Sequence, residues 1–258
     1  MITLKMKDNF YTYERVIFPE QQIKSDADVI RYMRFYDSKR LPRNVNIDVC
    51  MTPITNLILS EEEIKKKYSK DVRYEIRRAA RENIEYQIYD NLRVSNDEIF
   101  ITDLVDKYYS FCDIIGEPHL KNNLNMPEFL KFIEQGNLIV SKASFKNGWT
   151  YHIYQVDGKH TMLWFSFSDY RKEGANRSMA GWANRGLHDY DIFYFKRKGY
   201  ELYDWGNISS IDMPNQIDKF KTSFGGEIRI VYSCFVGNTL KGKLLVKLRE
   251  VINKSRER

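Results

Sequence analysis

The pattern of apolar positions is most regular between residues 179 and 194. Apolar side chains recur there at intervals of three and four residues, at Met179, Trp182, Ala183, Gly186, Leu187, Tyr190, Phe193 and Tyr194. This spacing predicts an amphipathic helix with a continuous apolar stripe. The cations at 196–198 suit the negative end of a helix dipole, and Gly199 favours a left-handed exit. We therefore expect the helix to stop at Gly199 and a short strand, residues 201–204, to follow.

A polar stripe runs along a different face of the same predicted helix. It consists of Asn184, His188 and Asp191, at positions i, i+4 and i+7. Because an imidazole titrates near neutral pH, His188 is a candidate general base if this face borders a cleft. The same spacing also fits a half-exposed surface histidine, and the sequence does not decide between the two.

Apolar runs elsewhere predict a sheet built around three successive strands. Residues 138–145, 149–155 and 161–168 have strand composition, and turn residues separate them at 146–148 and 157–158. Further strands are predicted at 11–18, 45–51 and 84–89, and helices at 60–82, 95–112 and 127–136. Ser60 and Ser95 each precede an acidic residue at the capping-box spacing. The predicted fold class is α+β, a mixed, mostly antiparallel sheet flanked by helices.

Composition and charge narrow the class of protein. The 258 residues are 43% hydrophobic, enough for one large domain or two small ones with a core. No apolar run is long enough for a membrane span and no signal-peptide pattern opens the chain, so we expect a cytoplasmic protein. Three widely separated cysteines fit neither a disulfide framework nor a zinc site. Metalloprotease, Walker-loop and serine-hydrolase motifs are absent as well, and no metal is predicted.

The net charge of +6 is concentrated at the C-terminal end. Residues 238–258 hold seven Lys and Arg against two acidic residues, and the rest of the chain holds 34 against 33. A dedicated nucleic-acid binder usually has a broader basic surface. The tail therefore fits a docked helix whose apolar stripe is formed by Leu240, Leu244, Leu248, Val251 and Ile252.

Two stretches resemble the FemAB/FemX family of the GNAT acyltransferase superfamily. They are LHDYDIFYFKRKGYELYDWGNI, residues 187–208, and IDKFKTSFGG, residues 217–226. In that family a helix leads into a strand that closes on Tyr-Asp-aromatic-Gly, and Phe-Lys and Phe-Gly-Gly follow. A weaker similarity lies at residues 72–90, which resemble the family's basic helix and the strand after it.

The resemblance implies a GNAT-like sheet in two halves. Residues 1–136 would form a degenerate half on the acceptor side, and residues 137–258 the half that holds the acyl donor. In that superfamily the acyl carrier lies in the splay between two parallel strands, with its pyrophosphate at the start of the next helix. The corresponding loop here, residues 169–180, also fits an ordinary loop capped by Ser178, and it has one glycine where the GNAT pattern has two. Its predicted cofactor-binding residues are Arg171, Gly174, Arg177 and Ser178.

Acyl transfer to an amine needs a base and a donor for the oxyanion. The resemblance implies that Lys221, the lysine of the Phe-Lys motif, faces the acyl group and stabilises the oxyanion. Asp204 ends the predicted strand and joins His188 as a candidate base. Alternatively, Asp204 caps a turn and Lys221 lies on a surface strand. The acceptor pocket is predicted to be lined by Asn184, Trp205 and Asn207.

The predicted helix at 60–82 carries many cations. They are Lys65, Lys66, Lys67, Lys70, Arg73, Arg77, Arg78 and Arg81. This set fits a solvated face equally well as a phosphate-binding surface for a nucleotide-linked acceptor. In the second interpretation, which the resemblance encourages, Arg73 and Arg77 are predicted substrate contacts.

The resemblance favours an acyl-CoA-dependent N-acyltransferase. Its acceptor would be the amino group of a dTDP- or UDP-linked amino sugar for surface polysaccharide such as O-antigen, with acyl-CoA as co-substrate. One alternative is a FemX-like transfer from aminoacyl-tRNA to a peptidoglycan precursor, although the chain outside the tail is not basic enough to suggest tRNA binding. The other is a non-catalytic GNAT-fold binding module. The sequence leaves open whether the protein is a homodimer.

Overall fold

A computed structural model describes residues 1–8 and 10–256, with side chains up to residue 252. The chain divides into two compact units, one formed by Met1–Thr52 with Arg229–Arg258 and the other by Pro53–Ile228. The predicted boundary between residues 136 and 137 falls inside the second unit. The reason is that strand β5 (Glu85–Tyr89) pairs along its whole length with β6 (Leu138–Phe145). The degenerate character of the N-terminal half stays a prediction.

The first unit contains a small mixed sheet. Its strands are β1 (Ile2–Lys7), β2 (Thr12–Ile17), β3 (Val29–Phe35) and β10 (Glu227–Gly237), in the order β1-β2-β3-β10. Strands β2 and β3 are parallel, and the other two pairings are antiparallel. A short 3₁₀ turn, Ser38–Arg40, follows β3. Alternating apolar residues bury one side of the sheet in a core that includes Val16, Tyr32 and Phe35.

Helix α7 (Leu240–Arg256) completes this unit, but the docking face predicted for it is wrong. The stripe of Leu240, Leu244, Leu248, Val251 and Ile252 is exposed, at 50% or more for each residue. The face around Gly242 packs instead, and a Cβ on Gly242 would lie 1.8 Å from the carbonyl oxygen of Asp28. The small residue lets the helix backbone approach that close, and this contact decides which face is covered.

The second unit is built on one long sheet. Its strands run in the order β4-β9-β8-β7-β6-β5, with β4 (Ile47–Asn56), β7 (Gly148–Val156), β8 (His160–Ser168) and β9 (Leu202–Asp204). All neighbours are antiparallel except β8 and β9, which are parallel. The two predicted hairpins are confirmed, and Asn147 and Gly158 adopt positive φ in their turns.

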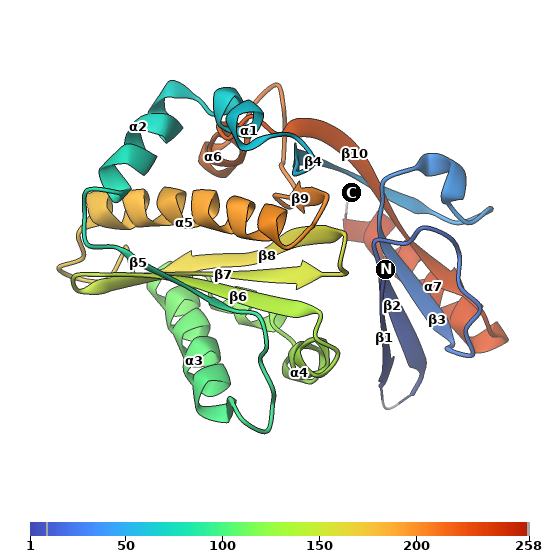
Figure 1. The fold of residues 1–258 in the computed structure, drawn as a ribbon. Coiled ribbons are helices and arrows are strands. Elements are labelled where there is room, and N and C mark those ends of the chain that lie inside the picture. The colour runs from blue at the N-terminus through green and yellow to red at the C-terminus, as the bar shows by residue number, and fades with distance from the viewer. Residues whose placement is uncertain (9, 257–258) are drawn as a thin grey trace. The chain divides into compact units, whose positions relative to one another are not determined.

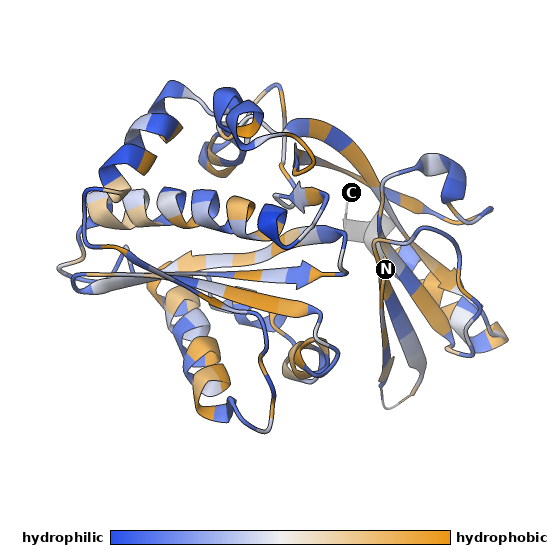
Figure 2. Ribbon diagram, in the orientation of Figure 1, coloured by the Kyte–Doolittle hydropathy of each residue, from blue (hydrophilic) through white to orange (hydrophobic). Residues whose placement is uncertain are grey.

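Helices cover both faces of this sheet (Figure 1). Helices α3 (Glu98–Ile114) and α4 (Met126–Glu134) lie on one face, with the 3₁₀ helix Pro118–Asn123 between them in the chain. Helices α1 (Glu61–Lys67), α2 (Lys70–Ala79), α5 (Arg177–Arg197) and α6 (Gln216–Thr222) lie on the other. Figure 2 shows hydrophobic residues along β6 and hydrophilic ones over much of α1 and α2. No helix among the described residues is long and apolar enough to cross a bilayer.

The predicted helix at 60–82 is two helices, because the chain is extended at Tyr68 and Ser69. Tyr68 is buried against Phe224, with ring centroids 5.2 Å apart, and its φ and ψ of −61° and 140° end α1. Ser69 then caps α2 by accepting the N–H of Val72. Packing of one tyrosine into the core therefore overrides a continuous helical pattern.

Helix α5 is buried on two faces. The apolar face packs as predicted, and Gly186 lies so close to β5 that a Cβ there would be 2.0 Å from the hydroxyl of Tyr86. The polar stripe is also inside, since His188 and Asp191 are both 0% exposed. Gly199 adopts the predicted left-handed conformation, with φ of 86°. A polar stripe without access to water must find its partners within the protein.

Candidate functional site

The only parallel pair in the sheet of the second unit separates part-way along β8. Strand β9 pairs with β8 from His160 to Met162, and it ends at Asp204. Strand β8 continues to Ser168, whereas the segment that follows β9 turns away at Gly206, whose φ is 75°. The sheet therefore opens beyond Met162, which is the splay that the resemblance implied.

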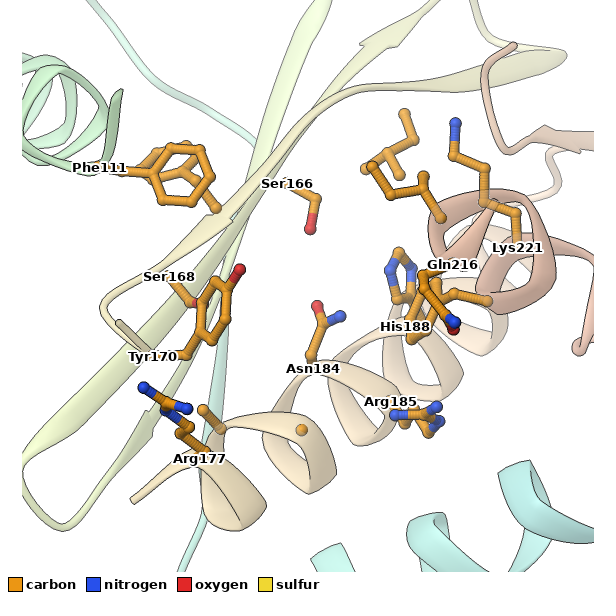
Figure 3. A pocket seen from close by; sticks show the side chains of 16 residues that line it. Phe111, Ser166, Ser168, Tyr170, Arg177, Asn184, Arg185, His188, Gln216 and Lys221 are labelled. Carbon is orange, nitrogen blue, oxygen red and sulfur yellow. The ribbon is translucent and has the colours of Figure 1, made fainter. Parts of the chain in front are cut away.

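A pocket of about 380 Å³ occupies this opening. Figure 3 shows its walls, which come from the end of β8, the first half of α5 and the short helix α6. Its apolar part is formed by Phe111, Leu163, Phe167, Ala180, Gly181, Ile217 and Phe220. Its polar part is formed by Ser166, Ser168, Tyr170, Arg177, Asn184, Arg185, His188, Gln216 and Lys221. A mainly apolar cavity with a few converging polar groups is typical of a small-molecule site.

The pocket is electropositive. Arg177, Arg185 and Lys221 all line it, and no Asp or Glu is among the residues of its wall. Arg177 is the first residue of α5, so the unpaired N–H groups and the positive dipole end of that helix lie beside its guanidinium. Asn176, not Ser178 as considered from the sequence, caps the helix by accepting the N–H of Met179. The arrangement favours an anionic ligand at this end of the pocket.

His188 lies on the wall of the pocket but contributes no surface to solvent. Burial, and then electrostatic repulsion from His152, Lys221 and Arg185, lower the pKa of His188 well below its usual value. The ring is therefore neutral at pH 7 and can accept a proton. Its Nδ1 is 2.9 Å from the hydroxyl of Tyr203, whereas its Nε2 is buried without a hydrogen-bond partner among the described residues.

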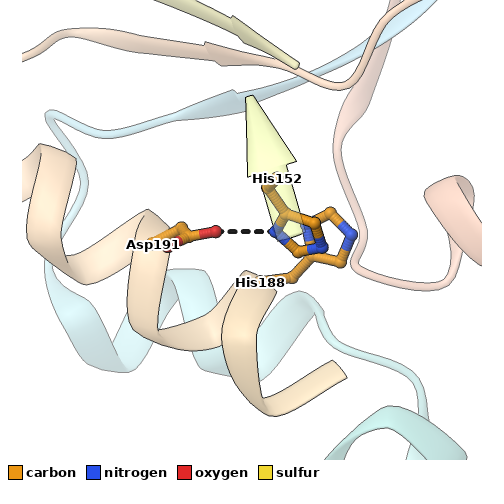
Figure 4. Close-up of side chains that lie close together, drawn as sticks. All are labelled: His152, His188 and Asp191. Carbon is orange, nitrogen blue, oxygen red and sulfur yellow. Dashed lines mark hydrogen bonds and ion pairs between the residues drawn. The ribbon is translucent and has the colours of Figure 1, made fainter. Parts of the chain in front are cut away.

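A buried polar network lies behind His188. The carboxylate oxygen Oδ2 of Asp191 accepts hydrogen bonds from Ser141 at 2.8 Å and Tyr154 at 2.6 Å, and Nδ1 of His152 lies 2.7 Å from it. Figure 4 shows this His152–Asp191 contact and the His188 ring, which stacks on His152 with centroids 4.0 Å apart. Nε2 of His152 in turn lies 2.8 Å from Oδ1 of Asn184, a pocket residue. The network thus connects one buried carboxylate to two groups at the pocket wall.

His152, His188 and Asp191 also group as metal ligands would, with one ligand atom from each within 4.8 Å of the others. However, the His152 and Asp191 atoms nearest each other are already joined at 2.7 Å. Nε2 of His152 is in contact with Asn184 as well, so neither ring nitrogen is left for an ion. The hydrogen bonds therefore favour a proton-carrying network over a metal centre.

The structure brings four of the predicted site residues to this pocket: Asn184, His188, Lys221 and Arg177. Lys221 lies on α6, a helix, rather than on the surface strand considered as an alternative. Its Nζ donates to the backbone carbonyl of Asn207 at 2.7 Å, which holds the ammonium near the opening.

Other predicted residues lie elsewhere. Asp204 is fully buried and its Oδ1 accepts the N–H of Gly206 at 2.8 Å, so the turn-capping alternative fits the structure better than the base. Trp205 is 0% exposed in the core rather than in the pocket wall, and its Nε1–H donates to Thr55. Asn207 is exposed and contributes its carbonyl to Lys221.

The remaining predicted contacts are outside the pocket wall. Arg171, Gly174 and Ser178 are exposed, and Nε of Arg171 donates to the hydroxyl of its neighbour Tyr170. Arg73 and Arg77 are exposed on α2, which packs against α5, and neither residue is part of the pocket wall. These residues were predicted as ligand contacts from the local sequence alone. The fold leaves them exposed to solvent.

Sequence reasoning missed Arg185 and the partners of the buried network, His152, Tyr154 and Tyr203. Arg185 forms an ion pair with Glu75 of α2 at 2.9 Å and lies over the ring of Phe220. Arg185 directly follows Asn184 in the sequence, and this position next to a predicted site residue could have identified it. The other three come from β7 and β9, and only the pairing of distant strands places them behind α5.

No protein-family model matches the sequence, and the comparison with curated proteins found no match. Solved structures do resemble the fold. The C-terminal domain of a putative lysylphosphatidylglycerol synthetase from Agrobacterium fabrum aligns with a TM-score of 0.57 at 10% identity, over 97% of this chain and 85% of that one. FemX aligns with a TM-score of 0.57 at 10% identity, over 89% and 83%. The chain therefore has the same kind of fold as these two proteins, a mixed sheet that is mostly antiparallel and flanked by helices.

Proposed function

We propose that this protein is an N-acyltransferase that moves an acyl group from an activated donor to an amine. The observation that carries the proposal is the electropositive pocket in the splay between β8 and β9, with neutral His188 on its wall. An acyl thioester placed there would lie between a proton acceptor and the ammonium of Lys221. His188 would take the proton of the attacking ammonium, and Lys221 would stabilise the oxyanion of the tetrahedral intermediate.

As donor we propose acyl-CoA, and as acceptor the amino group of a dTDP- or UDP-linked amino sugar used in surface polysaccharide. The start of α5 with Arg177 suits a pyrophosphate, because free N–H groups, dipole and guanidinium all favour an anion. A pocket of about 380 Å³ with Ser166, Ser168 and Gln216 on its wall suits a small polar acceptor better than a macromolecule.

An aminoacyl donor is a second candidate. It is favoured by the fold likeness to FemX and to the lysylphosphatidylglycerol synthetase domain, the second of which is named for a product that carries an amino acid. The pocket chemistry is the same for both donors, since each presents a carbonyl to an amine. They differ in the carrier, which is a nucleotide thiol in one case and tRNA in the other.

Thermal unfolding with CoA or with total tRNA separates the two donors. We expect saturating CoA at 100 times its Kd to stabilise the protein by about 2.7 kcal/mol, which raises Tm by several degrees. Arg177→Ala should reduce this shift, whereas Arg171→Ala, an exposed neighbour outside the pocket wall, should leave it unchanged. Stabilisation by tRNA alone that disappears between 50 and 200 mM salt would favour the second candidate. No response to either would contradict both.

Replacement of Lys221 by methionine is expected to lower kcat by ~100-fold, because one donor to the oxyanion is lost while the length of the side chain is kept. Lys219→Met is the matched control, since Lys219 is exposed on the same helix and does not line the pocket. Turnover would be followed by release of free CoA thiol. Equal rates for the two variants would remove Lys221 from the mechanism.

A further inference from the structure

The buried chain of hydroxyl groups behind His188 has a defined direction. We infer that Asp191, acting through Tyr154 and Tyr203, holds His188 in the Nδ1–H tautomer, so that Nε2 is the atom that accepts the proton of the amine. This inference rests on the proposed function for the identity of the proton donor. The tautomer itself follows from hydrogen-bond geometry.

The direction starts at Asp191. Its Oδ2 receives three groups, Ser141 Oγ at 2.8 Å, His152 Nδ1 at 2.7 Å and Tyr154 Oη at 2.6 Å, so this oxygen acts as an acceptor. A tyrosine hydroxyl has one proton to give. Tyr154 therefore donates its proton to Asp191 and must accept at its other two contacts, with Nδ1 of His152 at 3.2 Å and with Tyr203.

The hydroxyl of Tyr203 lies 2.8 Å from that of Tyr154. Because Tyr154 accepts there, Tyr203 donates its only proton to Tyr154. Tyr203 must then accept at its remaining contact, the 2.9 Å distance to Nδ1 of His188. A neutral imidazole has one N–H, and this contact places it on Nδ1.

Nε2 of His188 is left with its lone pair. It is buried without a partner among the described residues, and the ring belongs to the wall of the pocket. The titratable and charged groups that face this ring are His152 from β7, Arg185 from α5 and Lys221 from α6. All three oppose protonation of His188 when the pocket is empty. The negative end of the chain, Asp191, lies two hydroxyl groups away and can stabilise an imidazolium once it forms.

The proton step is balanced. An N–H bond of the acceptor ammonium breaks and an Nε2–H bond forms on His188, which leaves a neutral amine able to attack the acyl carbonyl. The imidazolium then donates from Nδ1 to Tyr203, within the existing chain to Asp191. In this arrangement His188 is the catalytic residue, and Tyr203, Tyr154 and Asp191 are positioning residues.

The test is ¹⁵N NMR of the imidazole nitrogens, which is practical because the chain has four histidines. We expect wild-type His188 to give the pattern of a protonated Nδ1 and a bare Nε2. Tyr203→Phe should give a mixture of tautomers and lower kcat by about 10- to 100-fold, part of the 10²- to 10⁴-fold supplied by a general base. Asp191→Asn, which can donate where the carboxylate only accepts, should move the population towards Nε2–H.

Tyr151→Phe is the matched control. Tyr151 is a buried tyrosine on the same strand as Tyr154, and it stacks on Phe167 rather than joining the chain. An Nε2–H tautomer in the wild type, or an unchanged His188 pattern in both Tyr203→Phe and Asp191→Asn, would overturn the inference. The spectra need no substrate. The expected tautomer without any transfer activity would thus leave this inference standing and count against the proposed function alone.

Discussion

Replacement of His188 by glutamine is expected to lower the rate of acyl transfer by about 10²- to 10⁴-fold, the range that a positioned general base contributes. Glutamine keeps a polar side chain of similar length that can still donate to Tyr203, but it cannot accept a proton at neutral pH. The decrease should appear in kcat, with a much smaller change in KM, because the lost interaction belongs to the reacting state. Steady-state kinetics at pH 7 with a saturating donor would measure it.

The pH dependence gives an independent readout. The pKa of His188 is lowered by burial first and by nearby cations second, so the native state stays neutral below the usual value of 6.5. In the unfolded state the same group gains a proton near 6.5, which favours unfolding as pH falls below that value. The wild type should therefore lose stability relative to His188→Gln as the pH falls below about 6.5. Parallel stability curves for the two proteins would contradict a depressed pKa for this histidine.

The strands at the centre of the second unit were predictable from sequence because local signals agree there. Apolar runs, turn residues and positive-φ positions all indicate the same boundaries, and the structure confirms β6, β7 and β8 within one or two residues. Gly225, in the Phe-Gly-Gly stretch, adopts φ of 74°, and a Cβ would lie 2.2 Å from the carbonyl oxygen of Lys67, so both conformation and space require glycine.

The candidate site was predictable only in part. The polar stripe on α5 identified Asn184 and His188, because helical spacing alone puts them on one face. The sequence could not tell whether that face met water or the sheet. Tyr203 and His152 answer the question, yet they lie on strands whose pairing with distant segments no local pattern encodes.

Trp205 shows why a motif residue can be misassigned. It stands in the Asp-Trp-Gly-Asn stretch beside other predicted site residues, and for that reason we expected it in the acceptor pocket. The strand β9 ends one residue earlier, and the alternation of side chains directs the indole to the opposite side from Asp204, into the core. There the indole lies against the ring of His188, and only the fold shows that His188 rather than Trp205 reaches the pocket wall.

This position leads to the largest stability effect that we expect. Trp205→Ala should lower the free energy of unfolding by about 3–5 kcal/mol, since the indole is fully buried and its removal leaves a cavity. The ring packs on Tyr203, Phe224 and His188, with centroids 4.9, 4.6 and 4.7 Å away. Urea unfolding followed by far-UV circular dichroism would measure the change at constant m-value.

Trp205→Phe separates packing from hydrogen bonding. Phenylalanine keeps most of the ring contacts but loses the Nε1–H donated to Thr55 at 3.0 Å, a hydrogen bond with a net contribution of about 1 kcal/mol. We expect it to cost clearly less than the alanine variant. Because the indole also supports the ring of His188, both variants should lower kcat at temperatures where they remain folded. A loss for Trp205→Ala below about 1 kcal/mol would mean that the aromatic cluster rearranges to fill the space, and the position of His188 would then not depend on this packing.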